Sequence, residues 1–306
     1  MAIQREDFAQ VSHLELIARQ VVEGFITGLH KSPFHGFSVE FAEHRIYNTG
    51  EPTRHIDWKL FGRTDKLFTK RYEEETNLRC QIVVDNSASM HFPAYDKKFP
   101  DRLNKITFSS YCAAAIMQLL KMQRDAAGLS LFSDKLEVNT PARSSTVHHK
   151  LLLHKLEEAM QSEGSKSTAL SAALHQVAES IHRRSLVVIF SDLFGDPAQS
   201  GELFSALQHL RYNKHEVVVF HVVDKRLELD LRFENRPYRF VDVETGEEVK
   251  LQPASIRESY LSQMQAYRKE LELKCAQYRI DFVEADVNLG YKQVLMPYLI
   301  KRGRMM

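Results

Sequence analysis

The spacing of hydrophobic and polar positions predicts a regular series of strands and helices from about residue 80 onward. Five short segments are nearly continuous in apolar and β-branched residues, the composition of strands that are covered on both faces. They lie at residues 80–85, 127–133, 185–192, 216–223 and 280–287. Because helical patterns alternate with them, we expect an α/β fold with a doubly wound, mostly parallel sheet.

Between these strands, apolar residues recur every three or four positions, which is the period of a helix that buries one face. The predicted helices span 102–124, 147–161, 168–183, 200–212 and 254–278, and a last amphipathic segment carries Val294, Leu295, Tyr298 and Leu299. Residues 224–251 instead alternate polar and apolar positions around the turn sequence ETGEE. They predict a β-hairpin inserted between a strand and the long helix.

The first part of the chain differs in composition from the rest. After a helical pattern near residues 13–30, it is rich in His, Gly, Pro, Asn and charged residues, which favours short strands and turns. We therefore expect two units: residues 1–78, a helix plus a β-rich region with an Ile-Asp-Trp segment, and residues 79–303, the α/β domain. Trp58, the single tryptophan, is expected to anchor the first unit against the second.

Composition restricts the classes of partner. The chain has 306 residues, with 41 Lys and Arg against 40 Asp and Glu, so its net charge of +1 gives no general attraction to nucleic acid or to an anionic membrane. Basic and aromatic residues mix at 54–71, but acids at Asp57, Asp65 and 73–75 interrupt them, so we expect no nucleic-acid site there.

Targeting signals and cysteines indicate the compartment. No apolar run reaches the roughly 18 residues of a membrane span, and the first residues lack the apolar core of a secretory leader. The three cysteines form no C-x-x-C pair and have no zinc-binding spacing, so we expect buried reduced thiols. These features predict a cytoplasmic protein without a membrane span.

Polar side chains gather where the predicted strands end. Asp85, Ser87 and Ser89 follow the first core strand, Asp192 follows a later one, and Thr168 lies in a Gly/Ser-rich loop before a helix. The carboxyl ends of parallel strands meet at one rim of a sheet, so we expect these five side chains to converge. All five offer oxygen, which suits Mg²⁺, or Mn²⁺, and disfavours zinc and copper.

Each of these residues also has an ordinary structural interpretation. Ser87, Ser89 or Thr168 could cap the helix that follows it, and Asp192 could close a turn. A serine nucleophile is disfavoured, because DNSASM lacks the G-x-S-x-G elbow and no histidine is marked out as its base. A metal-dependent hydrolase that uses Asp85 and Asp192 remains the alternative function. His148 and His149 lack ligand spacing and are expected at surface or turn positions.

The set resembles a known site. DNSAS at 85–89, Thr168, and Asp192 in FSDLFGD resemble the metal-ion-dependent adhesion site (MIDAS) of von Willebrand factor A (VWA) domains. The segment from HGFSVEF to EEETN, with Ile-Asp-Trp inside it, resembles bacterial proteins of the domain of unknown function 58 family, which carry such a domain behind an Ile-Asp-Trp segment. The resemblance covers roughly residues 11 to 300.

This resemblance implies adhesion rather than catalysis. By it, Ser87, Ser89 and, in the occupied site, Thr168 would coordinate Mg²⁺ directly, while Asp85 and Asp192 would act mainly through water. An Asp or Glu of a protein partner would complete the coordination. Similar proteins are often encoded beside MoxR-type AAA+ ATPases, so the implied role is an adaptor in ATPase-driven assembly, maturation or remodelling of protein complexes.

Overall fold

The computed structural model describes residues 13–26, 41–47, 56–72, 78–94, 102–162, 164, 169–194, 200–243 and 246–305. Its centre is a six-stranded sheet of order β10-β7-β6-β3-β4-β5, in which all neighbours are parallel except β4 and β5. This confirms the predicted fold class. The strands are β3 (Arg79–Asp85), β4 (Ala126–Phe132), β5 (Leu136–Arg143), β6 (Leu186–Ser191), β7 (Glu216–Val223) and β10 (Asp281–Asp286).

The edge strand β5 was not predicted from the sequence. Its residues alternate between half-buried and exposed, and it contains Pro141 and several polar residues. An edge strand needs only one neighbour and one covered face, so it can contain proline and lacks the apolar run of a central strand. The central strand β6, by contrast, is buried along its whole length.

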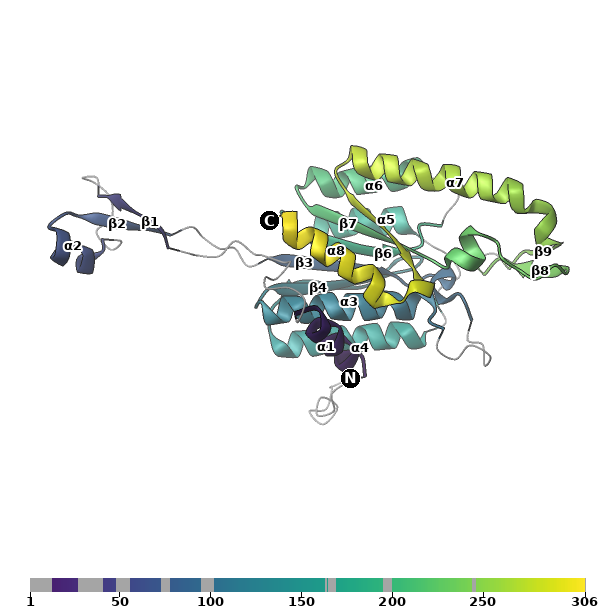
Figure 1. Cartoon of the computed structure of the whole chain (residues 1–306), viewed down its shortest axis with the longest axis horizontal. Coiled ribbons are helices and arrows are strands. Elements are labelled where there is room, and N and C mark those ends of the chain that lie inside the picture. The colour runs from purple at the N-terminus through teal and green to yellow at the C-terminus, as the bar shows by residue number, and fades with distance from the viewer. Residues whose placement is uncertain are drawn as a thin grey trace.

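Helices cover both faces of the sheet (Figure 1). One face packs against α1, α3, α4 and α8, and the other against α5, α6 and α7. The bounds are α1 (His13–Ile26), α3 (Lys105–Met122), α4 (Thr146–Gln161), α5 (Leu170–Ser180), α6 (Ser200–Tyr212), α7 (Pro253–Gln277) and α8 (Tyr291–Met305).

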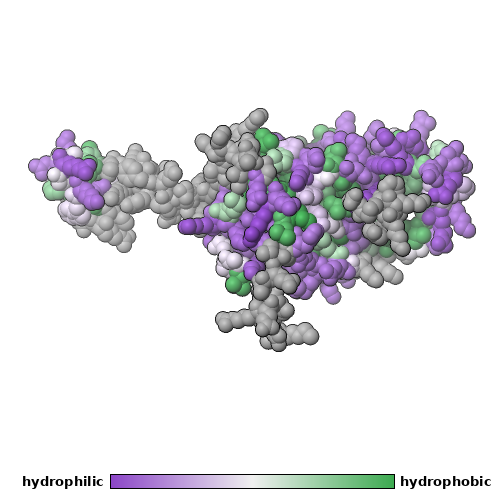
Figure 2. All heavy atoms as spheres, turned by 60° about the horizontal axis from the view of Figure 1, so that its bottom comes forward, coloured by the Kyte–Doolittle hydropathy of each residue, from purple (hydrophilic) through white to green (hydrophobic). Residues whose placement is uncertain are grey.

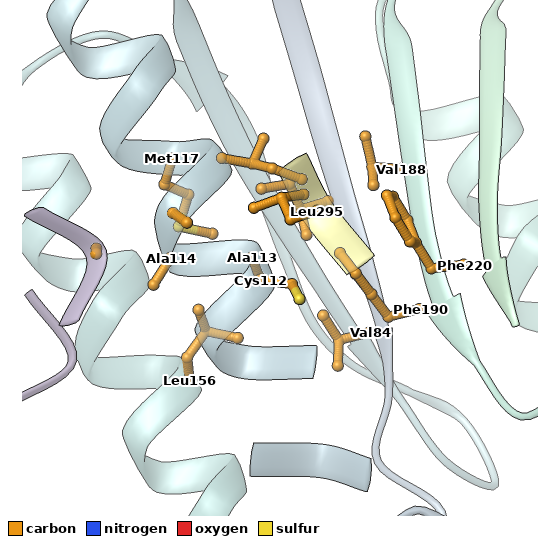
Figure 3. Close-up of a cluster of buried hydrophobic side chains, with 14 of the residues drawn as sticks. Val84, Cys112, Ala113, Ala114, Met117, Leu156, Val188, Phe190, Phe220 and Leu295 are labelled. Carbon is orange, nitrogen blue, oxygen red and sulfur yellow. The ribbon is translucent and has the colours of Figure 1, made fainter. Parts of the chain in front are cut away.

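Figure 3 shows the core of the first face. Side chains of α3 such as Cys112 and Met117 meet Val84 of β3, Phe190 of β6 and Leu295 of α8. All five residues are at most 1% exposed. Burying this apolar surface is the main force that holds the helices on the sheet.

The order of the strands defines where a ligand site belongs. The chain runs from β3 to β4 and β5 on one side, then crosses to β6, β7 and β10 on the other. Ligands of open α/β sheets bind at such a switch point, outside the carboxyl ends of the strands that flank it. Here these are the ends of β3 and β6, which carry Asp85 and Asp192.

The N-terminal part divides into two in the structure. Helix α1 packs on α3 and α4, and its Leu14 and Val22 are buried in the core of the α/β domain. The elements β1 (Phe41–Ile46), α2 (Trp58–Thr64) and β2 (Phe68–Tyr72) form a small unit that lies apart from the sheet (Figure 1). The boundary at residues 78/79 remains a prediction.

Trp58 does not anchor the N-terminal unit on the α/β core, so that prediction is wrong. It is the first residue of α2, it is 61% exposed, and its ring lies edge-on to Phe61 at 6.2 Å. The neighbouring Asp57 caps the helix by accepting bonds from the backbone N–H groups of Lys59 and Leu60. No described residue of α2 is buried, so the helix offers the indole no pocket.

The hairpin insertion is confirmed. It begins with a π-helical turn, η5 (Lys225–Leu229), and continues into the antiparallel pair β8 (Tyr238–Val241) and β9 (Glu248–Leu251). Within the described ranges, no helix combines the length and apolarity required to cross a bilayer. In Figure 2, hydrophilic residues dominate the visible face, and the hydrophobic ones form small separate groups.

Candidate metal site at the switch point

Asp85 is the last residue of β3, and its carboxylate is held on both sides. One oxygen, Oδ1, accepts from the backbone N–H of Ser87 at 3.0 Å, and Oδ2 accepts from the hydroxyl of Ser191 at 2.7 Å. The residue is 1% exposed. These bonds fix the carboxylate between the ends of β3 and β6.

The hydroxyls of Ser87 and Ser89 lie together. Their Oγ atoms are 3.0 Å apart, at the start of the short 3-10 helix η3 (Ala88–His91). Ser87 holds the N-cap position of that helix but makes no capping bond through its side chain. Capping therefore does not explain the position of the Ser87 hydroxyl.

Asp192 follows β6 directly and is 1% exposed. Its Oδ1 accepts from the backbone N–H of Phe194 at 3.1 Å, so the turn-closing interpretation is correct for one oxygen. Between them Leu193 has a φ of 53°, a left-handed conformation that is costly for leucine. The sharp turn at Leu193 lets Phe194 reach back to the carboxylate.

Thr168 lies outside the described residues, so its place in the site stays a prediction. Gly164 before it and Ala169 after it are described. Gly164, with φ of 72°, lies so close to η3 that a Cβ there would be 3.0 Å from the backbone N of Ala88. On the other side, Ala169 donates its backbone N–H to the carbonyl of Ser133, just after β4, at 2.7 Å. Ala169 itself occupies the N-cap position of α5.

The structure adds Lys105, which the sequence analysis did not include. Its Nζ donates to Asp192 Oδ2 at 2.8 Å and to Glu228 Oε1 at 2.5 Å, and its side chain is fully buried. Lys105 is the first residue of α3, where the helix dipole disfavours a cation. The sequence pattern started this helix at residue 102, so it did not single out Lys105.

More acidic groups surround this pair. Asp224 forms an ion pair with Arg102 and accepts from the side-chain amide of Asn288 at 2.9 Å. The same amide donates to Asp286, at the end of β10, at 2.8 Å. The rim of the sheet therefore carries more carboxylates than cations, which favours the binding of a positive ion.

Burial and repulsion act on the charges at the site. Burial, followed by the nearby charge of Asp192, raises the pKa of Asp85 from 3.8 to about 7, against the lowering effect of its hydrogen bonds. Burial opposes the charge on Lys105, yet Asp192 and Glu228 raise the pKa of its amine above the ordinary value, so it is an ammonium. Burial likewise raises the pKa of Glu228, while Lys105 lowers it.

The serine pair fits the proposed metal. Octahedral Mg²⁺ holds its ligands at about 2.1 Å, which places adjacent oxygens about 3.0 Å apart. The Oγ atoms of Ser87 and Ser89 have this separation. Among the described residues no group of three or more His, Cys, Asp and Glu side chains is arranged to hold a metal. A site here would therefore depend on the hydroxyls as well as the acids.

Comparison with known proteins places the chain in a family. The family described as "Protein of unknown function DUF58" matches residues 43–270. Uncharacterized proteins of Mycobacterium bovis and Mycobacterium tuberculosis are 26% identical over 218 residues, which is 71% of this chain. The chain spans 65% of the length of these curated relatives.

Solved structures with similar folds are more distant in sequence. An aerotolerance-related membrane protein of Bacteroides fragilis is 12% identical, with a TM-score of 0.44 over 75% of this chain and 100% of that one. The conserved hypothetical protein BatB of Bacteroides thetaiotaomicron is 11% identical, with a TM-score of 0.43 over 74% and 99%. At these scores the two structures add nothing to an assignment of function.

Proposed function

Since the chain belongs to the DUF58 family, which has no assigned function, we propose that it is a protein-binding module that holds Mg²⁺ through Ser87, Ser89, Asp85 and Asp192 at the rim of its sheet. Thr168 is included in the proposed ligand set. Mn²⁺ is the alternative metal, because it accepts the same oxygen ligands. A bound ion would supply a Lewis acid with an open position for a carboxylate of another protein.

The observation that carries this proposal is the serine pair. Two hydroxyls at 3.0 Å, of which that of Ser87 makes no capping bond to η3, lie beside the buried carboxylate of Asp85, which in turn interacts with the charge of the buried Asp192. Asp85 and Asp192 are held by hydrogen bonds from the protein, so they can balance the metal charge without large rearrangement. The hydroxyl of Ser87 lies 3.0 Å from that of Ser89 and also bonds the carboxylate of Asp85, a cluster of oxygen donors that suits a hard divalent cation.

We further propose, from the resemblance to MIDAS proteins, that the partner is a protein with an exposed Asp or Glu, and that it works with a MoxR-type AAA+ ATPase. The chain would then be an adaptor in the assembly, maturation or remodelling of protein complexes. Neither role requires catalysis by this chain. Metal-dependent turnover of a phosphoester, peptide or acyl substrate that Asp85→Ala abolishes would support the hydrolase alternative instead.

Thermal unfolding with and without metal tests the site. A ligand at ten times its Kd stabilises the folded state by about 1.4 kcal/mol, or roughly 3–5 °C in Tm for a domain of this size. We expect the Tm of the wild type to be higher in Mg²⁺ than in EDTA. The Tm of the Ser87→Ala/Ser89→Ala variant should be the same in both. Ser255→Ala, at an exposed serine of α7, is the control and should respond like the wild type. An equal Mg²⁺ response in the double variant would exclude this site.

Partner binding is tested separately. A MoxR-type ATPase, or the proteins captured with it, should bind the wild type in Mg²⁺ and dissociate in EDTA. The Ser87→Ala/Ser89→Ala variant should capture none of them under either condition. Capture that is equal in EDTA and Mg²⁺ would mean that the contact does not use the metal.

A further inference from the structure

A buried ion bridge joins the candidate metal site to the inserted hairpin segment. It consists of Asp192, Lys105 and Glu228, with one ammonium shared between two carboxylates at 2.8 and 2.5 Å. Resting on the proposed function, we propose that Lys105 is a positioning residue that couples metal occupancy at the rim to the insertion at residues 224–251.

The three members of the bridge come from different parts of the fold. Asp192 follows β6, Lys105 begins α3, and Glu228 lies in η5 at the base of the insertion. The Lys105 side chain is 0% exposed and that of Glu228 is 15% exposed. An interaction between charges is much stronger in such a place than at the surface, because water screens it little. A change in the charge around Asp192 therefore alters the strength of the Lys105–Glu228 ion pair.

Glu228 also organises the base of the insertion. Its Oε2 accepts from the backbone N–H of Asp224 at 2.7 Å, and its backbone carbonyl accepts from the hydroxyl of Tyr260 on α7 at 2.6 Å. Asp224 in turn caps η5 by accepting from the N–H of Leu227. The carboxylate that pairs with Lys105 thus holds the turn from which the hairpin leaves the domain.

We expect the strength of the two ion pairs of Lys105 to depend on whether a metal ion is bound at the rim. With a divalent cation at the rim, the ammonium is repelled on the Asp192 side, where the carboxylate charge is already balanced. Lys105 then pairs more strongly with Glu228. Stronger pairing reduces local opening of η5 and of the hairpin that follows it. Metal binding would therefore order the insertion without any direct contact with it.

Hydrogen–deuterium exchange of the full chain, with MgCl₂ or EDTA, measures this coupling. In the wild type we expect Mg²⁺ to slow exchange of the amides at 225–230 by about fivefold, at the low end of usual couplings between sites. Lys105→Met should exchange faster in this segment and show no Mg²⁺ dependence there. Lys105→Met leaves two buried acids unpaired, which is strongly destabilising. Glu228→Gln is therefore the second variant, for use if Lys105→Met does not fold. It should still gain Tm with Mg²⁺, but without slower exchange at 225–230.

Lys225→Met is the matched control. Lys225 lies in the same turn, and its Nζ pairs with Glu284 of β10 at 3.7 Å, away from the bridge. This variant should keep the Mg²⁺ effect on exchange. If Lys105 had only a structural role, its variants would exchange faster at 225–230 to the same extent in Mg²⁺ and in EDTA. Exchange of the wild type in this segment would then not depend on Mg²⁺.

The outcomes separate this inference from the proposed function. If Mg²⁺ raises the Tm of the wild type but exchange at 225–230 does not change, the coupling is wrong and the metal site stands. Retention of the Mg²⁺ effect on exchange in folded Lys105→Met, or in Glu228→Gln if Lys105→Met does not fold, also contradicts the coupling. Absence of any Mg²⁺ effect on the wild-type Tm overturns both.

Discussion

Three charged side chains at the rim are buried, although burial disfavours their charged forms. Asp85 and Asp192 are like charges that are both about 1% exposed, and Lys105 is a fully buried cation. Burying such groups is costly unless each finds a partner of opposite charge or a hydrogen bond. Lys105 supplies part of that compensation. The charge that remains on Asp85 is the expected reason for the protein to bind a cation there.

We predict that Asp85→Asn stabilises the protein in EDTA at pH 8. The pKa of Asp85 is about 7 in the folded state and 3.8 ordinarily, so between these values the folded state binds more protons than the unfolded one. Stability therefore falls as the pH rises through this window and stays lower above it. The neutral amide of the variant would lack this penalty, and denaturant unfolding should show a gain on the order of 2 kcal/mol.

The same variant should lose its response to Mg²⁺, since the amide carries no charge. Asp134→Asn, at an exposed acid in the loop after β4, is the control and should change neither quantity. Lower stability of Asp85→Asn in EDTA at pH 8 would show that the hydrogen bonds of this carboxylate outweigh its repulsion from Asp192.

At the scale of elements, helix α4 shows how a surface prediction fails. His148 and His149 were expected at surface or turn positions, but both lie within a helix and are 8% and 2% exposed, so that expectation is wrong. Both lie in the first turn of α4, and His148 donates from Nε2 to the carbonyl of Ala127 on β4 at 3.0 Å. Ligand spacing says nothing about burial, which depends on the face that a helix turns inward.

His149 should make the protein sensitive to acid. Burial first, and then the charge of Lys121, lower the pKa of His149 from 6.5 to about 4. Between these values the unfolded chain binds more protons, so stability is full above pH 6.5 and is lost as the pH falls toward 4. The loss from this one group is on the order of 2–3 kcal/mol.

Denaturant unfolding of the wild type and His149→Gln at pH 7.5 and pH 5 tests this. The variant should lose clearly less stability than the wild type between the two pH values. His154→Gln, at an exposed position of the same helix, should lose as much as the wild type. Equal losses in all three proteins would show that His149 does not titrate in this range.

At the scale of the whole molecule, the hydrophobic core of the α/β domain includes helix α1, from near the start of the chain. Helix α1 buries Leu14, Ala18, Val21 and Val22 against α3 and α4, whereas β1, α2 and β2 contribute nothing to the hydrophobic clusters of the α/β domain that the structure describes. Stability of the domain should therefore depend on α1 more than on the elements that lie closer to it in sequence.

Two substitutions distinguish these parts. Leu14→Ala removes a side chain that is 1% exposed and should cost about 2–4 kcal/mol of unfolding free energy. Phe61→Ala in α2 should change the unfolding of the α/β domain by less than about 0.5 kcal/mol. Circular dichroism during urea unfolding measures both. A Phe61→Ala cost as large as that of Leu14→Ala would show that the small unit and the domain unfold together.

The sequence by itself determined the α/β class, the buried parallel strands, the helices between them and the inserted hairpin. It also placed Asp85, the two serines and Asp192 at strand ends, because hydrophobic period and strand termination are local properties of a chain. The tertiary structure alone decided the edge strand β5, the exposure of Trp58 and the burial of Lys105 between Asp192 and Glu228. Lys105 and Glu228 are 123 positions apart, and only the packing of α3 against the end of β7 brings their charges together. Such a contact has no period along the chain, so no local pattern can reveal it.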